Sequence, residues 1–302
     1  MNHLKLRHFR LIQAIAETEQ LSVAAERVGI TQPAASRTLK EIEKSLGQPV
    51  FERHPKGMTA TPIGQVLARH SRTLMTDLVQ AQEELRAFDA GEAGAVRVGA
   101  VTGAAVGYVV PAIQQLGADQ ADISVEVAPS TDLMDGLLNG ELDFILSRVP
   151  GGTDIRRLLI LGGRVEELRF LVRTGHPLLE RRGLSIGELG GLTWVTQAPG
   201  MPIRNAVEQA FLSENCPPPS EVINSSSLLL MTAYLQSSDA VTAVATEVAE
   251  LLDATRNGRF RALHMQKSIV MGPYHLIREQ TRRMNPLAER LLALVAQAMA
   301  DH

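Results

Sequence analysis

Cysteine is nearly absent from this 302-residue sequence: Cys216 stands alone, so no disulfide can form within the chain. A single cysteine is typical of a protein in a reducing compartment, and we expect the cytoplasm. No apolar run reaches about 18 residues, which argues against a membrane-spanning helix. The N-terminal stretch MNHLKLRHFRLIQ also lacks the apolar centre and small-residue cleavage site of a signal peptide.

Basic residues are slightly outnumbered by acidic ones overall, and they are enriched at one end of the chain. The formal net charge is -3, yet the residues up to Arg72 include eleven lysines and arginines against six acidic residues. This head therefore carries about +5, which leaves about -8 for the remaining body. A basic head on an acidic body is expected when only the head meets a polyanion such as DNA. Because the excess is modest, we expect an oligomer to accumulate the phosphate contacts.

The stretch from Leu21 to Leu46 predicts two short helices joined by a tight turn. The first is expected at 22–28, with Ser22 as its N-cap, and Gly29 permits the sharp reversal through a positive φ. Thr31 caps the second helix, and Pro33 lies in its first turn, where a missing N–H costs nothing. The apolar residues of this second helix recur at helical spacing and comprise Ala35, Leu39, Ile42 and Leu46.

The other face of the second helix is polar and basic, which is the layout of a helix-turn-helix whose second helix enters the DNA major groove. Gln and Arg side chains suit base edges, while Ser, Arg and Lys hold phosphates. The alternative is an ordinary helical hairpin with one solvated basic face. The residues expected to contact DNA are Thr31, Gln32, Pro33, Ser36, Arg37 and Lys40, joined by Arg53 and Lys56 from the segment that follows.

Two short strands around a basic loop come next, at residues 49–53 and 57–60. They form a wing able to place Arg53 and Lys56 beside the minor groove or its phosphates. Thr61 and Pro62 then start a helix of roughly thirty residues, about 45 Å long. Its narrow apolar seam favours pairing with a second copy of itself over packing on the body. The seam consists of Ile63, Leu67, Leu74, Leu78, Ala81, Leu85 and Phe88.

Beyond a glycine-containing boundary at residues 91–94, strand-like apolar runs alternate with helical segments. The alternation predicts an α/β body with helices flanking mixed sheets, and the length of the chain suggests about two domains. Strands are expected at 95–101, 123–128, 142–146, 167–172, 192–196, 221–224, 240–245, 260–265 and 269–278. Helices are expected at 109–116, 132–139, 203–214, 228–236 and 247–253, with a last one from Asn285 onward.

Several strand-to-helix joins of the body carry hydroxyl groups. Ligands of open α/β sheets bind beyond the strand C-termini, near helix N-termini, so these joins predict a cleft for a small polar or anionic effector. Arg148 and Arg204 are candidates to clamp a carboxylate as a forked pair, although either one alone is often a surface cation and a lone Ser or Thr only an N-cap. The expected effector-binding residues are Thr102, Gly103, Ser130, Thr131, Ser147, Arg148, Thr196, Pro202, Ile203, Arg204, Ser226 and Thr246.

The order of these features resembles the LysR-type transcriptional regulators. The resemblance is carried by Thr31 to Arg37, by Phe51-Glu52-Arg53, by Thr61-Pro62-x-Gly64 and by Gly175-His176-Pro177-Leu178 in the body. The sequence departs from the family at Ala35, where a larger aliphatic residue is common, so the packing of the second helix is expected to differ slightly.

The fold that the resemblance implies combines α+β and α/β parts in two domains. These are an N-terminal winged helix-turn-helix, a long linker helix, and a C-terminal effector domain of two α/β subdomains, like a periplasmic binding protein. The expected bounds are 1–61 for the DNA-binding domain, 62–91 for the linker (dimerisation) helix and 92–302 for the effector-binding domain. Subdomain I is expected at about 92–163 with 268–302, and subdomain II at about 164–267, with crossover strands near 161–165 and 266–270.

As a function, the resemblance implies regulation of transcription in response to a small-molecule effector. The body resembles the branch of the family that controls sugar or aromatic-acid catabolism genes, so the expected effector is a carboxylate or a sugar. The expected partners are double-stranded operator DNA, a second copy of the chain through the linker helix, RNA polymerase and the effector, with no membrane. Many relatives are homotetramers. Dimer and tetramer both remain open, as do activation and repression.

Two other classes of protein remain as alternatives. A DNA-tethered α/β enzyme acting on its ligand would need a nucleophile with a positioned base. Cys216 has no neighbouring histidine, no G-x-S-x-G occurs, and the eight histidines are scattered without metal-ligand spacing. A sequence-tolerant architectural DNA-binding protein would not need an elaborate two-lobed body. We therefore expect a regulator that is not an enzyme and needs neither cofactor nor metal.

Overall fold

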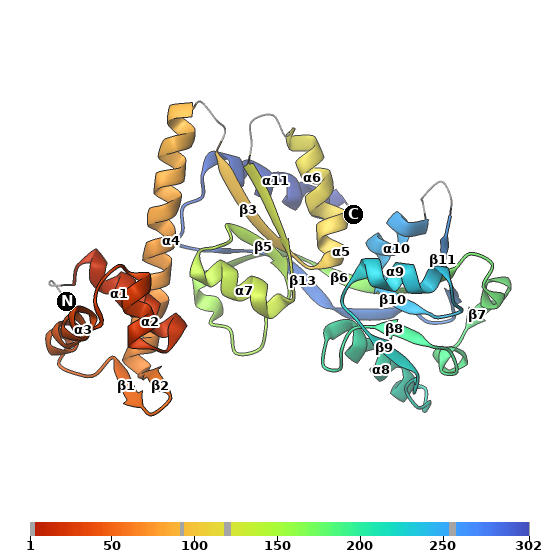
Figure 1. Cartoon of the computed structure of the whole chain (residues 1–302). Helices are drawn as coiled ribbons and strands as arrows, with labels where there is room; N and C mark the ends of the chain where they lie inside the picture. Colours follow the sequence, from red (N-terminus) through yellow and green to blue (C-terminus); the bar gives the residue numbers. More distant parts are fainter. Residues whose placement is uncertain (1–3, 91–93, 118–121, 254–257, 302) are drawn as a thin grey trace. The chain divides into compact units, whose positions relative to one another are not determined.

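The computed structural model describes residues 4–90, 94–117, 122–253 and 258–301, apart from the side chains of 80, 83–84 and 86–90 (Figure 1). Its contacts divide the chain into two units, the first centred on residues 1–96 and the second holding most of the remainder. No helix in the described ranges is both long and apolar enough to cross a membrane. The first unit contains α1 (Leu6–Thr18), α2 (Leu21–Arg27), α3 (Gln32–Leu46), β1 (Phe51–His54), β2 (Gly57–Ala60) and α4 (Pro62–Ala90).

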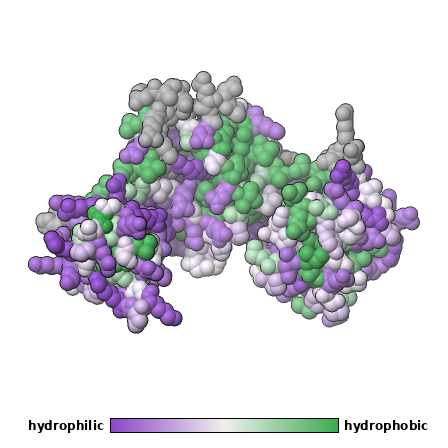
Figure 2. All heavy atoms as spheres, in the orientation of Figure 1, coloured by the Kyte–Doolittle hydropathy of each residue, from purple (hydrophilic) through white to green (hydrophobic). Residues whose placement is uncertain are grey.

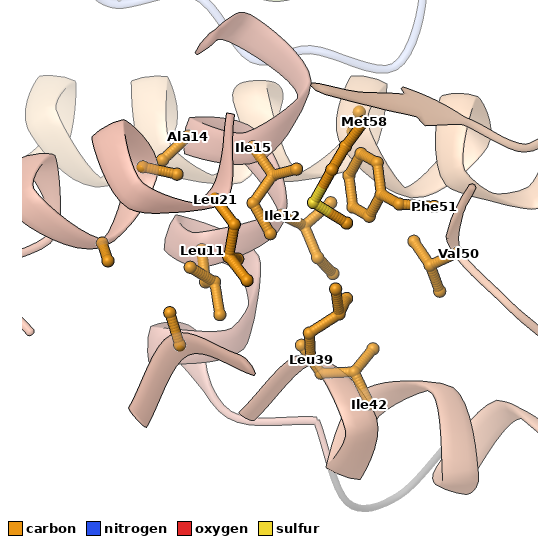
Figure 3. Close-up of a cluster of buried hydrophobic side chains, with 14 of the residues drawn as sticks. Leu11, Ile12, Ala14, Ile15, Leu21, Leu39, Ile42, Val50, Phe51 and Met58 are labelled. Carbon is orange, nitrogen blue, oxygen red and sulfur yellow. The ribbon is translucent and has the colours of Figure 1, made fainter. Parts of the chain in front are cut away.

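The core of the first unit forms where α1 covers α2, α3 and the β1–β2 hairpin. Figure 3 shows Leu39 and Ile42 pointing from α3 toward Leu11, Ile12 and Ile15 of α1. All five side chains are buried, as the helical spacing predicts. Burial of such side chains contributes about 1.5–3 kcal/mol each, which is why α3 holds a fixed face toward solvent.

The turn between α2 and α3 forms largely as predicted. Gly29 has φ +72°, Thr31 Oγ1 accepts a hydrogen bond from Ala34 N at 3.4 Å, and Pro33 lies in the first turn of α3. The cap of α2 was predicted wrongly. Its N-cap is Gln20, whose side chain makes no capping bond, and Ser22 lies inside the helix. The helix begins earlier because Leu21 is buried in the core.

The second unit alternates strands and helices along the chain. Short 3-10 turns lie at Ile155–Arg157, Pro177–Glu180 and Ile186–Leu189, and a π-helical turn lies at Ala105–Val109. The helices are α5 (Thr102–Ala104), α6 (Val110–Leu116), α7 (Ser130–Asn139), α8 (Pro202–Ser213), α9 (Leu228–Gln236), α10 (Thr246–Asp253) and α11 (Pro286–Asp301). The strands are β3 (Ala95–Ala100), β4 (Asp122–Val127), β5 (Phe144–Ser147), β6 (Leu158–Arg173), β7 (Arg182–Leu184), β8 (Trp194–Thr196), β9 (Val222–Asn224), β10 (Thr242–Ala245), β11 (Phe260–Ala262), β12 (His264–Met265) and β13 (Ile269–Glu279).

One mixed sheet has the strand order β10-β6-β13-β5-β3-β4, with β11 also paired to β6 (Figure 1). Its β3–β5 pair is parallel, whereas β13 is antiparallel to both β5 and β6. The pair β8–β9 is parallel and forms a separate two-stranded sheet. A second core surrounds Trp194, whose ring meets Phe170 and Phe211 edge-on at centroid distances of 5.7 Å.

The longest strand was only partly predicted. β6 is one strand of 16 residues, although only 167–172 was expected from the sequence. The expected crossover at 161–165 lies inside β6, and the one at 266–270 overlaps the start of β13, whose register shifts between Met271 and Tyr274. The helix expected at 109–116 likewise continues from helical turns that begin at Thr102. The boundary residues 91–93 lie outside the described ranges.

Candidate DNA-binding surface and effector cavity

The predicted reader face of α3 is exposed in the first unit. Gln32, Arg37 and Lys40 are exposed, while Ala35 and Leu39 on the opposite side are buried. Figure 2 shows hydrophilic side chains over much of the unit that carries α3. With 15 residues, α3 is about 22 Å long, which is enough to lie in a major groove. Thr31 and Pro33 are exposed at its N-terminal end, where base contacts are made in helix-turn-helix proteins.

The wing is fixed to the end of α1. Met58 N donates a hydrogen bond to Glu19 O at 2.7 Å, and Gly57 adopts φ +146° directly beside that carbonyl. A Cβ at residue 57 would approach Glu19 O to 2.3 Å, so only glycine fits this turn. Lys56 at the tip is exposed.

The wing and the reader helix are also joined directly. Arg53 Nη2 donates a hydrogen bond to Ser36 Oγ at 3.2 Å, so the structure brings together two residues that the sequence assigns separately to DNA. At the base of the wing, Glu43 Oε1 accepts from Val50 N at 3.0 Å. The basic face of α3 and the basic strand of the wing therefore form one surface, which we call the reader surface: Thr31, Gln32, Pro33, Ser36, Arg37, Lys40, Arg53 and Lys56.

The seam of α4 is largely open to solvent beyond its first turns. Leu67 is 9% exposed, whereas Leu74 is 44% and Leu85 is 65% exposed. Phe88, also assigned to the seam, lies outside the described side chains. Exposed leucines at this spacing suit a partner helix, which would remove them from water.

A cavity of about 280 Å3 lies in the second unit, beyond the C-terminal ends of β3, β5 and β8. Polar side chains from several elements line it, as expected for the ends of strands in an α/β sheet. Seven of the predicted effector residues are among the lining: Thr102, Gly103, Ser130, Arg148, Pro202, Ile203 and Ser226.

The other predicted effector residues do not line this cavity. Thr131 is exposed and bonds to Asp132, Ser147 is buried and donates to Arg148 O, and Thr246 donates to Glu167 O. Thr196 is buried, with no partner for its hydroxyl in the described part of the chain. Arg204 is buried and its Nε donates to Glu208, one helical turn away, so the structure does not bring it beside Arg148.

Sequence reasoning missed most of the remaining lining. Glu166 and Gln197 are polar, and the apolar members include Met201, Met231 and Met271. Glu166 gave no signal because it lies among other polar residues of a strand that was not predicted there. Gln197 directly follows the end of β8, next to Thr196, and this position is the sequence feature that could have identified it.

Arg148 is held in place by three neighbours. Its Nη2 donates to Glu166 Oε2, its Nε donates to Gly272 O at 3.0 Å, and its backbone N donates to Ser130 Oγ at 3.4 Å. Burial raises the pKa of the Glu166 carboxyl above its ordinary value, while the Arg148 guanidinium opposes that shift. The predicted cation of the cleft is therefore present, and a carboxyl group of the protein already contacts it.

A second carboxyl group lies just behind the cavity wall. Glu247 Oε1 accepts a hydrogen bond from Tyr274 OH at 3.4 Å, and its Oε2 is buried with no hydrogen-bond partner in the described residues. A Cβ on Gly103 would come within 2.7 Å of Glu166 Oε1 and 3.2 Å of Glu247 Oε2. Burial raises the pKa of the Tyr274 hydroxyl, with further contributions from Tyr108 and Glu247. The two carboxyl groups thus flank one glycine at the N-terminal end of the α5 turns.

The first unit carries an exposed basic helix with a wing, and the second is an α/β unit with a cavity. This combination is typical of the class of ligand-responsive DNA-binding proteins. Two family models match the chain. "Bacterial regulatory helix-turn-helix protein, lysR family" matches residues 6–65, and "LysR substrate binding domain" matches residues 89–300. The chain therefore belongs to the LysR family of DNA-binding transcriptional regulators, whose second domain binds an effector.

Individual relatives agree with this assignment. The transcriptional regulator GbpR of Azospirillum brasilense is 36% identical over 98% of this chain and 86% of its own length. PcaQ of Agrobacterium fabrum is 28% identical over 96% of this chain and 94% of its own length. Among solved structures, a full-length variant of OxyR from Pseudomonas aeruginosa has a TM-score of 0.64 at 21% identity, covering 98% of this chain and 95% of that one. CbnR in complex with its target DNA has a TM-score of 0.63 at 19% identity, covering 98% of this chain and all of the other, so the two-domain fold is shared.

Proposed function

We propose that the reader surface binds operator DNA and that the cavity of the second unit binds the effector that controls this activity. The hydrogen bond between Arg53 and Ser36 is the observation that best supports the first part, because it unites helix and wing in one basic surface. Arg37 is the proposed base-reading residue, since it is exposed one turn into α3.

The test of the reader surface uses a duplex selected from a random library by the wild-type protein. Arg37→Ala is expected to lose sequence-specific protection in footprinting while its oligomeric state stays unchanged. Lys44→Ala, exposed in the last turn of the same helix, is the control and should retain the footprint. An unchanged footprint in Arg37→Ala would refute the assigned face.

The effector part is supported by the meeting of residues from separate segments in one cavity, with Thr102 and Ser130 from one side and Ile203 and Ser226 from another. A ligand that binds one conformation of the protein more tightly shifts the population toward that conformation. The coupling free energy between an effector site and a DNA-binding site is typically about 1–3 kcal/mol. Thr102→Val and Ser130→Ala are therefore expected to keep DNA binding and to weaken the effector response. A normal response in both variants would remove the cavity from the proposal.

The proposed partners include a second copy of the chain, bound through the exposed seam of α4, and RNA polymerase at the regulated promoter. Assembly of two such dimers into a tetramer is part of the same proposal, supported by exposed leucines on α9 (Leu229 and Leu230), where Figure 2 shows a hydrophobic area. Because the operator lies on the chromosome, the proposed location is the cytoplasm.

We also infer that the cavity performs no catalysis. Its described lining has serine and threonine hydroxyls but neither histidine nor cysteine, and its one carboxyl group, Glu166, is paired with Arg148. The expected result is that purified protein releases a bound ligand chemically unchanged, as judged by mass spectrometry. Accumulation of a product would favour the enzyme alternative.

A further inference from the structure

The charge inside the cavity is already balanced by the protein. Arg148 and Glu166 are the two charged residues among its described lining, and their side chains contact each other. The Glu166 side chain is 4% exposed and that of Arg148 is 19% exposed, so the pair is shielded from solvent. Charges in such surroundings are screened far less than charges on a surface.

A second carboxyl group adds to the acidic side of this pair. Glu247 lies behind Gly103, where its Oε2 and Glu166 Oε1 would both lie within 3.2 Å of a Cβ on that glycine. The cavity therefore offers no uncompensated positive charge to a ligand. A ligand carboxylate that approached Arg148 would also approach the Glu166 carboxyl group that contacts it, and two carboxylates in one shielded site repel each other.

The rest of the lining offers uncharged hydrogen-bonding groups and apolar surface. Thr102, Ser130 and Ser226 contribute hydroxyls, and the amide of Gln197 uses its Oε1 to accept from Ile203 N at 3.1 Å, which leaves its NH2 group to donate to a ligand. Three methionines, Met201, Met231 and Met271, supply apolar walls. A volume of about 280 Å3 is at the lower end of ligand pockets and suits one sugar ring.

We propose that this cavity selects a neutral, hydroxyl-rich molecule of monosaccharide size and discriminates against the corresponding acid, with Glu166 as the residue that sets the preference. The proposal rests on the proposed effector function of the cavity and decides between the two ligand classes, polar and anionic, that the sequence leaves open. Hydroxyl groups of such a ligand can donate to the Glu166 carboxylate and accept from Arg148 at the same time, without separating the pair.

The test measures binding to the full-length protein by isothermal titration calorimetry and thermal shift, with sugar pairs that differ in one carboxylate. The probes are D-galactose with D-galacturonate, D-glucose with D-glucuronate, and L-arabinose with L-arabinonate. At least one neutral member is expected to bind, and at least tenfold more tightly than its acid. Glu166→Gln, which removes the carboxyl group in contact with Arg148, should weaken binding of the neutral sugar about tenfold and strengthen binding of its acid partner.

The matched control is Glu167→Gln, the next residue of β6, which lies outside the cavity lining and bonds to Ser268. It should bind both members of a pair as the wild type does. An acid that binds the wild type as tightly as its neutral partner overturns the proposal, and so does a failure of all three neutral sugars to bind at millimolar concentration.

Variants of the cavity wall distinguish a failure of the proposed charge preference from a failure of the proposed effector role. If acids bind and Thr102→Val abolishes their binding, the cavity keeps its effector role and only the charge preference is rejected. If a neutral sugar binds and neither Thr102→Val nor Ser130→Ala affects it, the ligand lies elsewhere and the effector role of the cavity is rejected with the preference.

Discussion

Arg53 of the wing donates a hydrogen bond to Ser36 of α3 across 3.2 Å, before any DNA is present. An arginine held in this way has already lost part of its rotamer freedom, so less entropy is lost when it meets a phosphate. The two partners therefore contribute differently to binding. Arg53 brings the charge, and Ser36 positions it.

Substitution at these two positions should separate charge from positioning. Ser36→Ala keeps the charge of Arg53, so affinity for the selected duplex should fall by about 1 kcal/mol with an unchanged salt dependence. Arg53→Ala removes a phosphate contact and should lower the slope of log K against log salt by about 1. Fluorescence anisotropy over a range of KCl concentrations measures both. Ser45→Ala, exposed on the same helix, is the control and should match the wild type.

Thr61 is predicted to be a stabilising cap of α4. Its buried Oγ1 lies 3.0 Å from Pro49 O and 3.1 Å from Val50 O, and it accepts from Gly64 N at 3.1 Å. Thr61→Ala should therefore destabilise the first unit by about 1–2 kcal/mol, whereas Thr61→Ser should retain most of the stability. Circular dichroism during urea unfolding measures the change.

The single tryptophan provides an internal control for the Thr61 variants. Trp194 is buried in the second unit, where its Nε1 donates to Leu189 O at 2.9 Å. Its fluorescence should report unfolding of that unit and remain at the wild-type midpoint in Thr61→Ala. An equal shift of both signals would show that the two units unfold together and contradict the local effect.

Two glutamates should respond to pH in opposite directions. Burial raises the pKa of Glu166, so the stability it contributes is complete below its ordinary value of 4.5 and is lost as the pH rises. Hydrogen bonds from Ser185 and Arg181 lower the pKa of Glu188, so its contribution is present above 4.5 and is lost as the pH falls. The melting temperature of Glu166→Gln minus that of the wild type should therefore increase with pH above 4.5. The same difference for Glu188→Gln should decrease as the pH rises toward 4.5 and stay level above it, and parallel curves in differential scanning fluorimetry would reject this assignment.

The exposed seam of α4 predicts how the oligomer can be dissociated. Leu74→Glu combined with Leu85→Glu places charge where a partner helix would exclude water, so the subunits should separate. Size-exclusion chromatography with light scattering measures the mass. Gln65→Glu adds a negative charge at an exposed position outside the seam and should leave the mass unchanged. An oligomer that survives the double substitution would assign its interface to another surface.

The sequence predicted the first unit well because its signals are local. Thr31 as a cap, Pro33 in the first turn and Gly29 at positive φ each depend on the few residues around them. Ser22 was wrongly predicted as the N-cap of α2 because only neighbouring residues were considered. Leu21 is buried in the core, so the helix begins one residue before Ser22.

The cavity was harder to predict because its members come from distant segments. Arg148 was expected to pair with Arg204 around a ligand, but it contacts Glu166 of β6, and no periodicity in the sequence indicates such a pair. The position of Arg204 could have been anticipated from Glu208, four residues further along a predicted helix. The full length of β6 was also not predicted, because two glycines within a run argue against a strand. These are Gly162, at φ +54°, and Gly163.

The continuity of β6 has a consequence for how the second unit can change shape. The strand pairs with β13 over residues 158–168 and with β10 and β11 over residues 168–173, and its pairing with β13 skips Gly162, Gly163 and Val165. A ladder interrupted in this way holds the two ends of the strand and concentrates any change of twist in its middle. We expect the ends of the unit to rotate in opposite senses about the strand axis when a ligand enters, with faster amide exchange at residues 162–165 than at residues 168–172.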